Sequence, residues 1–157
     1  LSVDIGMFYK RRDYSRVVNG KNPILEHKYL GESLEGKDAI IVDDMISSGG
    51  SLLEVAKHLK EDYKARRVFC FATFGLFTDG FANFDKAYAD GYIDKIFTTN
   101  LIYQNPNVLR RDYYVSVDMS EYIAGLVDSM NHDSSIEPLL VPTFKIQKRV
   151  SEFKEKQ

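Results

Sequence analysis

The sequence has a single cysteine, Cys70, among its 157 residues. One cysteine cannot form an internal disulfide, and no cysteines or histidines are spaced as in a zinc site. Cys70 lies in the apolar run 68–72, so we expect a small core residue in a reducing compartment. This cysteine usage favours a cytoplasmic protein.

Long apolar runs and a strong net charge are also missing. No stretch approaches the about 20 apolar residues that a membrane-spanning helix needs, and no signal peptide is recognisable. We therefore expect no contact with a membrane. The formal net charge of -2 argues against a nucleic-acid-binding protein, which would present a basic face. The basic residues that do cluster, 10–12 with Arg16, belong to one short segment.

Repeats and low-complexity tracts are absent as well, and 157 residues are enough for one domain with a hydrophobic core. We expect this domain to cover residues 1–140 and a C-terminal tail to cover 141–157, where apolar residues among lysines allow a loose helix. The first apolar segment, 3–8, follows closely on Leu1. We interpret the chain as a part of a longer protein.

Apolar runs alternate with amphipathic segments along the chain. This order predicts an α/β fold with a mostly parallel central sheet flanked by helices in three layers. The last clear helix is expected to open at Asp118, with Glu121 completing a capping box. The other expected elements are strands at 3–9, 39–42, 67–74, 93–98 and 113–117, and helices at 50–62 and 80–90.

The most informative segment is 39–51, which reads AIIVDDMISSGGS. Its four leading apolar residues do not alternate with polar ones, which predicts a strand buried on both faces of a parallel sheet. Two adjacent carboxylates, Asp43 and Asp44, follow where this strand is expected to end. Open α/β folds bind their ligands at that edge of the sheet.

A loop of small residues then leads into the helix predicted over 50–62. Free backbone N–H groups and the positive end of a helix dipole bind phosphate at such a loop. Because carboxylates repel phosphate, Asp43 and Asp44 are expected to accept hydrogen bonds from sugar hydroxyls or to hold a cation. The segment predicts a site for a phosphorylated sugar; the alternative is a turn that contains serine and glycine only for its geometry. The loop residues are Ser47, Ser48, Gly49, Gly50 and Ser51.

Residues 10–28 are mostly polar and basic and contain Gly20 and Pro23. Long loops without secondary structure are uncommon in compact domains and usually form lids or disordered segments. We therefore expect a mobile lid here.

Segment 39–51 resembles the phosphoribosyl-binding signature of the type I phosphoribosyltransferase fold, in which an apolar strand leads into two acids and a loop of Thr/Ser-Gly-Gly-Thr/Ser. The Asp-Asp-Met variant is similar to the ribose-phosphate pyrophosphokinase family. Weaker similarities to that family occur in the right order along the chain, up to about residue 140. They lie at 9–13, 97–100, 117–120 and 133–136.

The resemblance implies transfer of a diphosphoryl group from ATP to the anomeric hydroxyl of ribose 5-phosphate, with Mg²⁺ as cofactor and a homo-oligomer as assembly. Asp43 and Asp44 would bind the ribose hydroxyls, and the loop from Ser47 to Ser51, with Arg12, would bind the 5-phosphate. Lys10 and Arg12 would be catalytic, stabilising charge on the transferring phosphorus. ATP-binding and metal-binding residues would lie outside this chain.

Ser47 departs from that family, which has an acid at this position. A nucleotide-forming phosphoribosyltransferase is one alternative, although it would usually have the acid too. A non-catalytic regulator that senses a phosphoribosyl ligand is the other, although it would not need Lys10 and Arg12.

Overall fold

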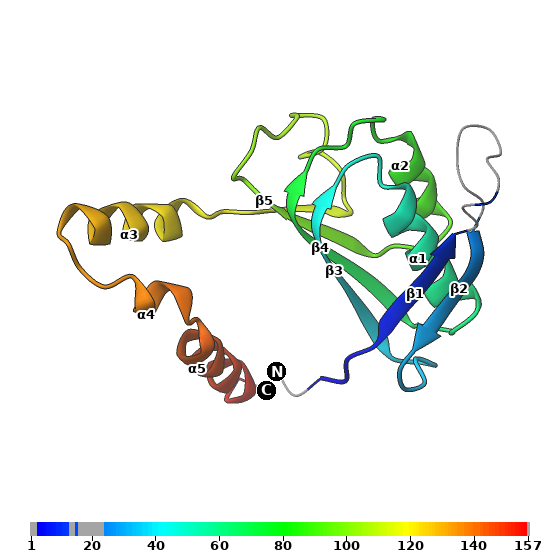
Figure 1. The fold of residues 1–157 in the computed structure, drawn as a ribbon, viewed down its shortest axis with the longest axis horizontal. Coiled ribbons are helices and arrows are strands. Elements are labelled where there is room, and N and C mark those ends of the chain that lie inside the picture. The colour runs from blue at the N-terminus through cyan, green and yellow to red at the C-terminus, as the bar shows by residue number, and fades with distance from the viewer. Residues whose placement is uncertain (1–2, 13–14, 16–23, 157) are drawn as a thin grey trace.

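Four strands form a parallel sheet in the order β3-β4-β5-β6 (Figure 1). The computed structural model describes residues 3–12, 15 and 24–156. It confirms the α/β class with a parallel central sheet flanked by helices. The strands are β3 (Asp38–Ile46), β4 (Arg67–Gly75), β5 (Lys95–Thr99) and β6 (Tyr114–Val117).

Two helices cover one face of this sheet and form the core with it. They are α1 (Gly50–Glu61) and α2 (Ala82–Ala89). Apolar side chains on alternate positions of the strands face them, because successive strand residues point to opposite faces. The fully buried members of this core include Ala56, Val68, Cys70, Phe84 and Ile96.

The opposite face of the sheet carries exposed apolar side chains. Ile40 and Val42 of β3 are 56% and 79% exposed. The strand register sets Val42 beside Phe71, and Phe71 beside Phe97, whose rings stack with their centroids 4.4 Å apart. The prediction that this strand is buried on both faces is therefore wrong. An unbroken apolar run shows that both faces suit burial, but it does not say what covers them.

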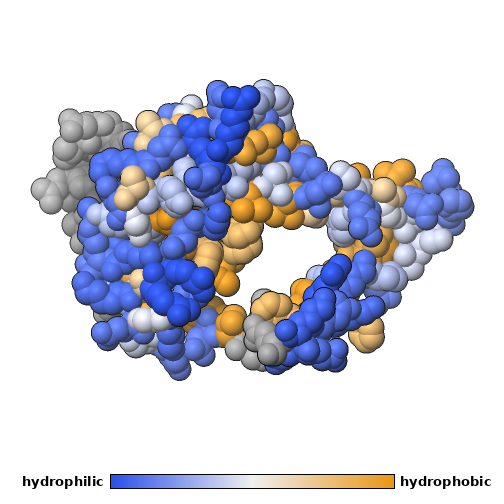
Figure 2. Space-filling view, turned by 180° about the vertical axis from the view of Figure 1, so that it is seen from behind, coloured by the Kyte–Doolittle hydropathy of each residue, from blue (hydrophilic) through white to orange (hydrophobic). Residues whose placement is uncertain are grey.

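The last three helices extend away from the sheet as an arm (Figure 1). They are α3 (Ser120–Asn131), α4 (Glu137–Leu140) and α5 (Thr143–Lys154). Hydrophobic side chains border the opening between this arm and the sheet (Figure 2). The apolar side chains of α3 are largely exposed, with Val127 at 61% and Met130 at 72%. Among the described residues, no helix is long and apolar enough to cross a membrane.

The start of α3 differs by one residue from the prediction. Asp118 Oδ1 accepts hydrogen bonds from the backbone N–H and the hydroxyl of Ser120, at 2.9 and 2.6 Å. The N-cap residue, however, is Met119. Since a capping box joins the N-cap to the third helical residue, the predicted pairing of Asp118 with Glu121 is wrong.

The segment expected to be a lid begins and ends in strands. β1 (Met7–Arg12) and β2 (Ile24–Leu30) form an antiparallel hairpin in a sheet of their own. Phe8 and Tyr29 of the hairpin pack on Tyr63, with ring centroids 5.9 and 5.2 Å away from it. The expectation that residues 10–28 lack secondary structure is thus wrong at both ends, because aromatic packing outweighs the polar composition. Residues 13–14 and 16–23 of this segment lie outside the described residues.

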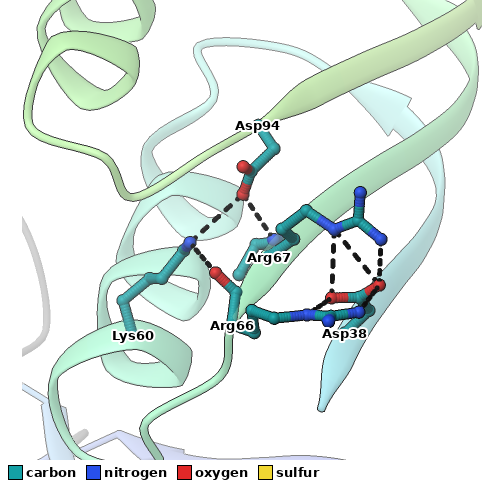
Figure 3. Close-up of polar contacts among 6 residues, drawn as sticks. Asp38, Lys60, Arg66, Arg67 and Asp94 are labelled. Carbon is teal, nitrogen blue, oxygen red and sulfur yellow. Dashed lines mark hydrogen bonds and ion pairs between the residues drawn. The ribbon is translucent and has the colours of Figure 1, made fainter. Parts of the chain in front are cut away.

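Ion pairs join the amino ends of the parallel strands (Figure 3). The carboxylate of Asp38 forms ion pairs with the guanidinium groups of Arg66 and Arg67, with N–O distances of 2.9 and 2.5 Å. These guanidinium groups hold the pKa of Asp38 well below its usual value. Asp94 accepts the backbone N–H of Val68 at 2.7 Å and pairs with Lys60 at 3.1 Å. These contacts stabilise the end of the sheet where the strands begin, opposite to the end where their carboxyl termini lie.

Candidate functional site

The two adjacent carboxylates lie inside β3, because the strand continues past them to Ile46. Side chains alternate along a strand, so Asp43 shares the helix-covered face with Ala39 while Asp44 shares the open face with Val42. The expectation that the acids follow the end of the strand is wrong, because the strand ends at Ile46, four residues beyond the expected residue 42. Asp43 Oδ1 accepts a hydrogen bond from the backbone N–H of Asp44 at 2.9 Å, which restrains the carboxylate.

The predicted phosphate loop leads directly into α1, as expected. Its N-cap is Gly49, with φ 82° and ψ -6°, and no acidic residue stands in the first turn. A glycine has no side chain to accept hydrogen bonds from the first-turn N–H groups, which also lack partners within a helix. These N–H groups and the positive end of the helix dipole make this end of α1 suitable for an anion.

Gly49 is held against the core by Phe84 of α2. A Cβ atom at position 49 would lie 2.0 Å from Phe84 Cζ, whereas the nearest atom to a Cβ at Gly50 is 3.8 Å away. Phe84 is fully buried. Packing therefore requires glycine at the first position of the pair and leaves open space at the second.

A second loop, between β4 and α2, lies against the first. The backbone N–H of Leu76 donates to Ile46 O at 2.9 Å, and the N–H of Thr78 donates to Ser47 O at 3.1 Å. The hydroxyls of Ser47 and Thr78 lie 3.4 Å apart. Thr78 is not among the site residues predicted from the sequence. The signal that could have found it is the adjacency of two parallel strands, which brings the loops after them to one edge of the sheet.

The carboxyl ends of β5 and β6 are joined by side chains of two segments that the sequence analysis had singled out separately. Asn100 Nδ2 donates to Asp118 Oδ1 at 2.8 Å, and Asn100 Oδ1 accepts the N–H of Met119 at 2.9 Å. Hydrogen bonds from Ser120 and then Asn100 lower the pKa of Asp118. The carboxylate of Asp118 therefore stabilises the turn that leads into α3.

Lys10 and Arg12 lie on β1, opposite His27 and Ile24 of β2. Their hairpin is not part of the sheet that carries Asp43, and their side chains lie outside what the structure describes. The catalytic role expected for these two residues stays a prediction.

Within residues 3–12, 15 and 24–156, no three His, Cys, Asp or Glu side chains gather as a possible metal site. Asp43 is exposed and can serve as a single carboxylate ligand. Mg²⁺ is often bound by only one or two carboxylates, with water and substrate phosphates supplying its other ligands. The residues present are therefore compatible with a magnesium ion that arrives with a phosphorylated substrate.

Comparisons with known proteins agree on one family. Residues 17–141 match the model of the phosphoribosyl synthetase-associated domain. Ribose-phosphate pyrophosphokinase of Shewanella oneidensis is 29% identical over 136 residues, covering 87% of this chain and 40% of the relative. The enzyme of the same name from Vibrio parahaemolyticus is 29% identical over 137 residues, with the same shares. That of Mycoplasma pneumoniae is 36% identical over 105 residues, covering 66% of this chain and 30% of the relative. The chain thus spans about two fifths of the length of the first two relatives.

Proposed function

Because the chain belongs to the phosphoribosyl synthetase-associated domain family, we propose that it binds ribose 5-phosphate for the synthesis of 5-phosphoribosyl 1-pyrophosphate. The names of its relatives support this general function. Since the chain spans 40% of their length, the complete reaction, the use of ATP and Mg²⁺, a homo-oligomeric assembly and a cytoplasmic location remain parts of the proposal.

The observation that carries the proposal is the placement of Asp43 and the loop at one end of the sheet. The loop from Ser47 to Ser51 opens α1 with a left-handed glycine at the N-cap and, among the described residues, no side chain that caps the helix. It offers donors to a 5-phosphate. Asp43, five residues before Ser48 and on the face that α1 covers, offers acceptors to ribose hydroxyls. Asp44 lies on the other face and has at most a secondary role.

The proposed reaction transfers a diphosphoryl group. The anomeric hydroxyl oxygen of ribose 5-phosphate attacks the β-phosphorus of ATP and releases its proton to solvent. The bond from that phosphorus to the oxygen bridging to the α-phosphate breaks, and AMP leaves with the electron pair on that oxygen. Such a transfer needs alignment and charge neutralisation more than covalent help from the protein. Mg²⁺ supplies neutralising charge when bound. Asp43 fixes the sugar, and Lys10 and Arg12 are proposed to stabilise charge on the transferring group.

The test is calorimetric titration of the chain with ribose 5-phosphate, using the open space at Gly50. Gly50→Asp adds a carboxylate beside the proposed phosphate position, where the added Cβ meets no atom closer than 3.8 Å, and Gly50→Asn is the matched neutral control. We expect the parent and Gly50→Asn to bind, and Gly50→Asp to bind at least about tenfold more weakly, because like charges repel. Equal binding by the two variants would show that the loop holds no phosphate.

A further inference from the structure

We propose that two copies of this chain pair through their C-terminal arms, with the basic helix α5 of each copy packed against the acidic helix α3 of the other. This inference rests on the homo-oligomeric assembly that forms part of the proposed function, and it names a surface that joins the copies. The family model ends at residue 141, so α5 lies outside the part of the chain that matches the family. The family match therefore does not imply this contact.

Acidic and basic residues are separated along the arm. The sequence has no lysine or arginine between Arg111 and Lys145, whereas the same interval contains six aspartates and glutamates. From residue 145 onward, five lysines and arginines stand against two glutamates. Helices α3 and α5 therefore carry charges of opposite sign, which attract each other. Each copy offers both signs, so the arms of two copies are complementary in charge.

Within one chain, α3 and α5 face each other across a groove of about 910 Å³. No ion pair among the described residues crosses this groove. Asp128 pairs with His132 and Lys148 pairs with Glu152, in each case with a partner four residues further along the chain. The charges of the two helices are therefore not matched within the chain. The charged residues that line the groove from the two helices include Glu121, Asp128, Lys145, Lys148 and Arg149.

The connection between α4 and α5 keeps α5 away from α3 of the same chain. Leu139 of α4 lies against Gly125 of α3, where an added Cβ would be 3.5 Å from Leu139 Cδ2. Only Val141 and Pro142 join α4 to α5, and the ring of a proline restricts its φ. Because α4 packs on α3 and this connection is short, α5 of a second copy can approach the acidic side of α3 more closely.

The arm also exposes enough surface for a stable interface. The chain exposes 11293 Å² to solvent, about 3000 Å² more than a compact monomer of 18.0 kDa is expected to expose. A standard interface covers about 800 Å² on each partner. The three helices of the arm contain no buried residue, and isolated helices as short as these are marginally stable in water. A second copy that covers the arm would stabilise them. The exposed apolar side chains of α3 and α5 include Val127, Met130, Phe144 and Phe153.

Reciprocal charge reversal tests this pairing. One variant carries Lys145→Glu and Lys148→Glu on α5, and the other carries Glu121→Lys and Asp128→Lys on α3. All four side chains are exposed, so we expect both variants to fold, and urea unfolding checks this. The control reverses the same number of charges away from the arm, with Lys57→Glu on α1 and Lys86→Glu on α2.

Sedimentation velocity at micromolar concentrations measures the association. The parent and the control should sediment as dimers, with twice the chain mass of 18.0 kDa. Each reversed variant alone brings like charges together at both contacts, so its dimer should be at least about tenfold weaker. An equal mixture of the two reversed variants should form a heterodimer as tight as the parent dimer, because both contacts again join opposite charges.

Three results would overturn the pairing. They are a parent that stays monomeric, reversed variants that dimerise as the parent does, and a mixture in which the two variants do not associate. Titration of the parent with ribose 5-phosphate separates these results from the proposed function. A chain that binds the sugar phosphate without dimerising loses only the pairing, whereas a dimer that binds no sugar phosphate keeps the pairing and loses the proposed ligand.

Discussion

The ring of Phe84 occupies the space that a side chain at position 49 would need. A Cβ atom built on Gly49 lies 2.0 Å from Phe84 Cζ and 2.7 Å from Cε2. Since Gly49 also has a φ of 82°, both its surroundings and its backbone conformation require glycine.

Gly49→Ala should therefore destabilise the protein by about 2–4 kcal/mol, the sum of core overpacking and an unfavourable backbone conformation. Urea unfolding measures this difference. Gly50→Ala is the matched control, because its Cβ meets no atom closer than 3.8 Å, and we expect a change below about 1 kcal/mol. In a Phe84→Leu background, Gly49→Ala should lower the free energy of unfolding by less than it does in the parent. An equal loss in both backgrounds would show that Phe84 does not exclude a side chain at position 49.

The stability of the protein should depend on the ion pairs of Asp38 above acidic pH. Hydrogen bonds from Arg66 and Arg67 lower the pKa of Asp38 in the folded state. A lowered folded pKa stabilises the fold above the unfolded pKa of about 3.9 and loses this contribution as the pH falls through the folded value. Asp38→Asn should thus destabilise the protein at neutral pH and progressively less below about pH 4.

Urea unfolding of the parent and Asp38→Asn across this pH range checks the prediction. Glu35→Gln, at an exposed turn shortly before β3, is the control for removing one carboxylate from this part of the chain. If the free energy of unfolding of Asp38→Asn differs from that of the parent by the same amount at all pH values, the variant acts through packing and not through charge.

Cys70 should be inert in the folded protein. It is fully buried, and burial, followed by the nearby charge of Asp94, raises the pKa of its thiol to about 12. Only the thiolate reacts with alkylating agents. Mass spectrometry after iodoacetamide treatment at pH 8 should show unmodified protein, and full modification in denaturant; rapid labelling without denaturant would contradict the placement of Cys70 in the core.

Arg111 should tolerate replacement by lysine poorly. Its guanidinium donates to both oxygens of Asp85, at 2.7 and 2.9 Å, and lies 4.3 Å from the ring centroid of Phe81. Lysine keeps the charge but cannot form this fork or stack in the same way. We expect Arg111→Lys to lower the free energy of unfolding by about 1–2 kcal/mol. Lys145→Arg, on the arm, is the control for the reverse exchange and should change it little.

Two valines on neighbouring strands test which face of the sheet is covered. Val42 is 79% exposed, whereas Val68 is fully buried beneath the helices. Val68→Thr should lower the free energy of unfolding by about 1–3 kcal/mol, because it buries a hydroxyl. Val42→Thr should lower it by less than about 0.5 kcal/mol. Thermal or urea unfolding measures both. A similar cost at the two positions would show that the open face is covered in solution.

The sequence predicted correctly those helices and strands whose apolar periodicity extends over most of their length. The helix expected at 50–62 is Gly50–Glu61, and the strand expected at 67–74 is Arg67–Gly75, because the apolar periodicity in these segments matches one structure only. Gly91 has a φ of 76° just after α2, as expected of a helix C-terminus. The hairpin of β1 and β2 was missed because its support comes from Tyr63, far away in the sequence.

The candidate site was predictable in composition but not in geometry. The acids and the loop follow one another along the chain, so their order could be read directly. The opposite faces of Asp43 and Asp44 depend on the strand continuing to Ile46. The contact of Ser47 with Thr78 joins residues 31 positions apart, which only the pairing of β3 with β4 brings together.

The ion pairs of Asp38 and the carboxylate of Asp43 lie on one strand, five residues and about 16 Å apart. One end of β3 therefore carries ion pairs whose contribution to stability is lost in acid, and the other end carries the carboxylate that we propose binds the ligand. Substitutions on the Asp38 side, far beyond hydrogen-bond reach of the loop, should leave affinity unchanged. Tolerance of acid and choice of ligand are therefore properties that an engineered variant can change separately, because different residues of the same strand serve them.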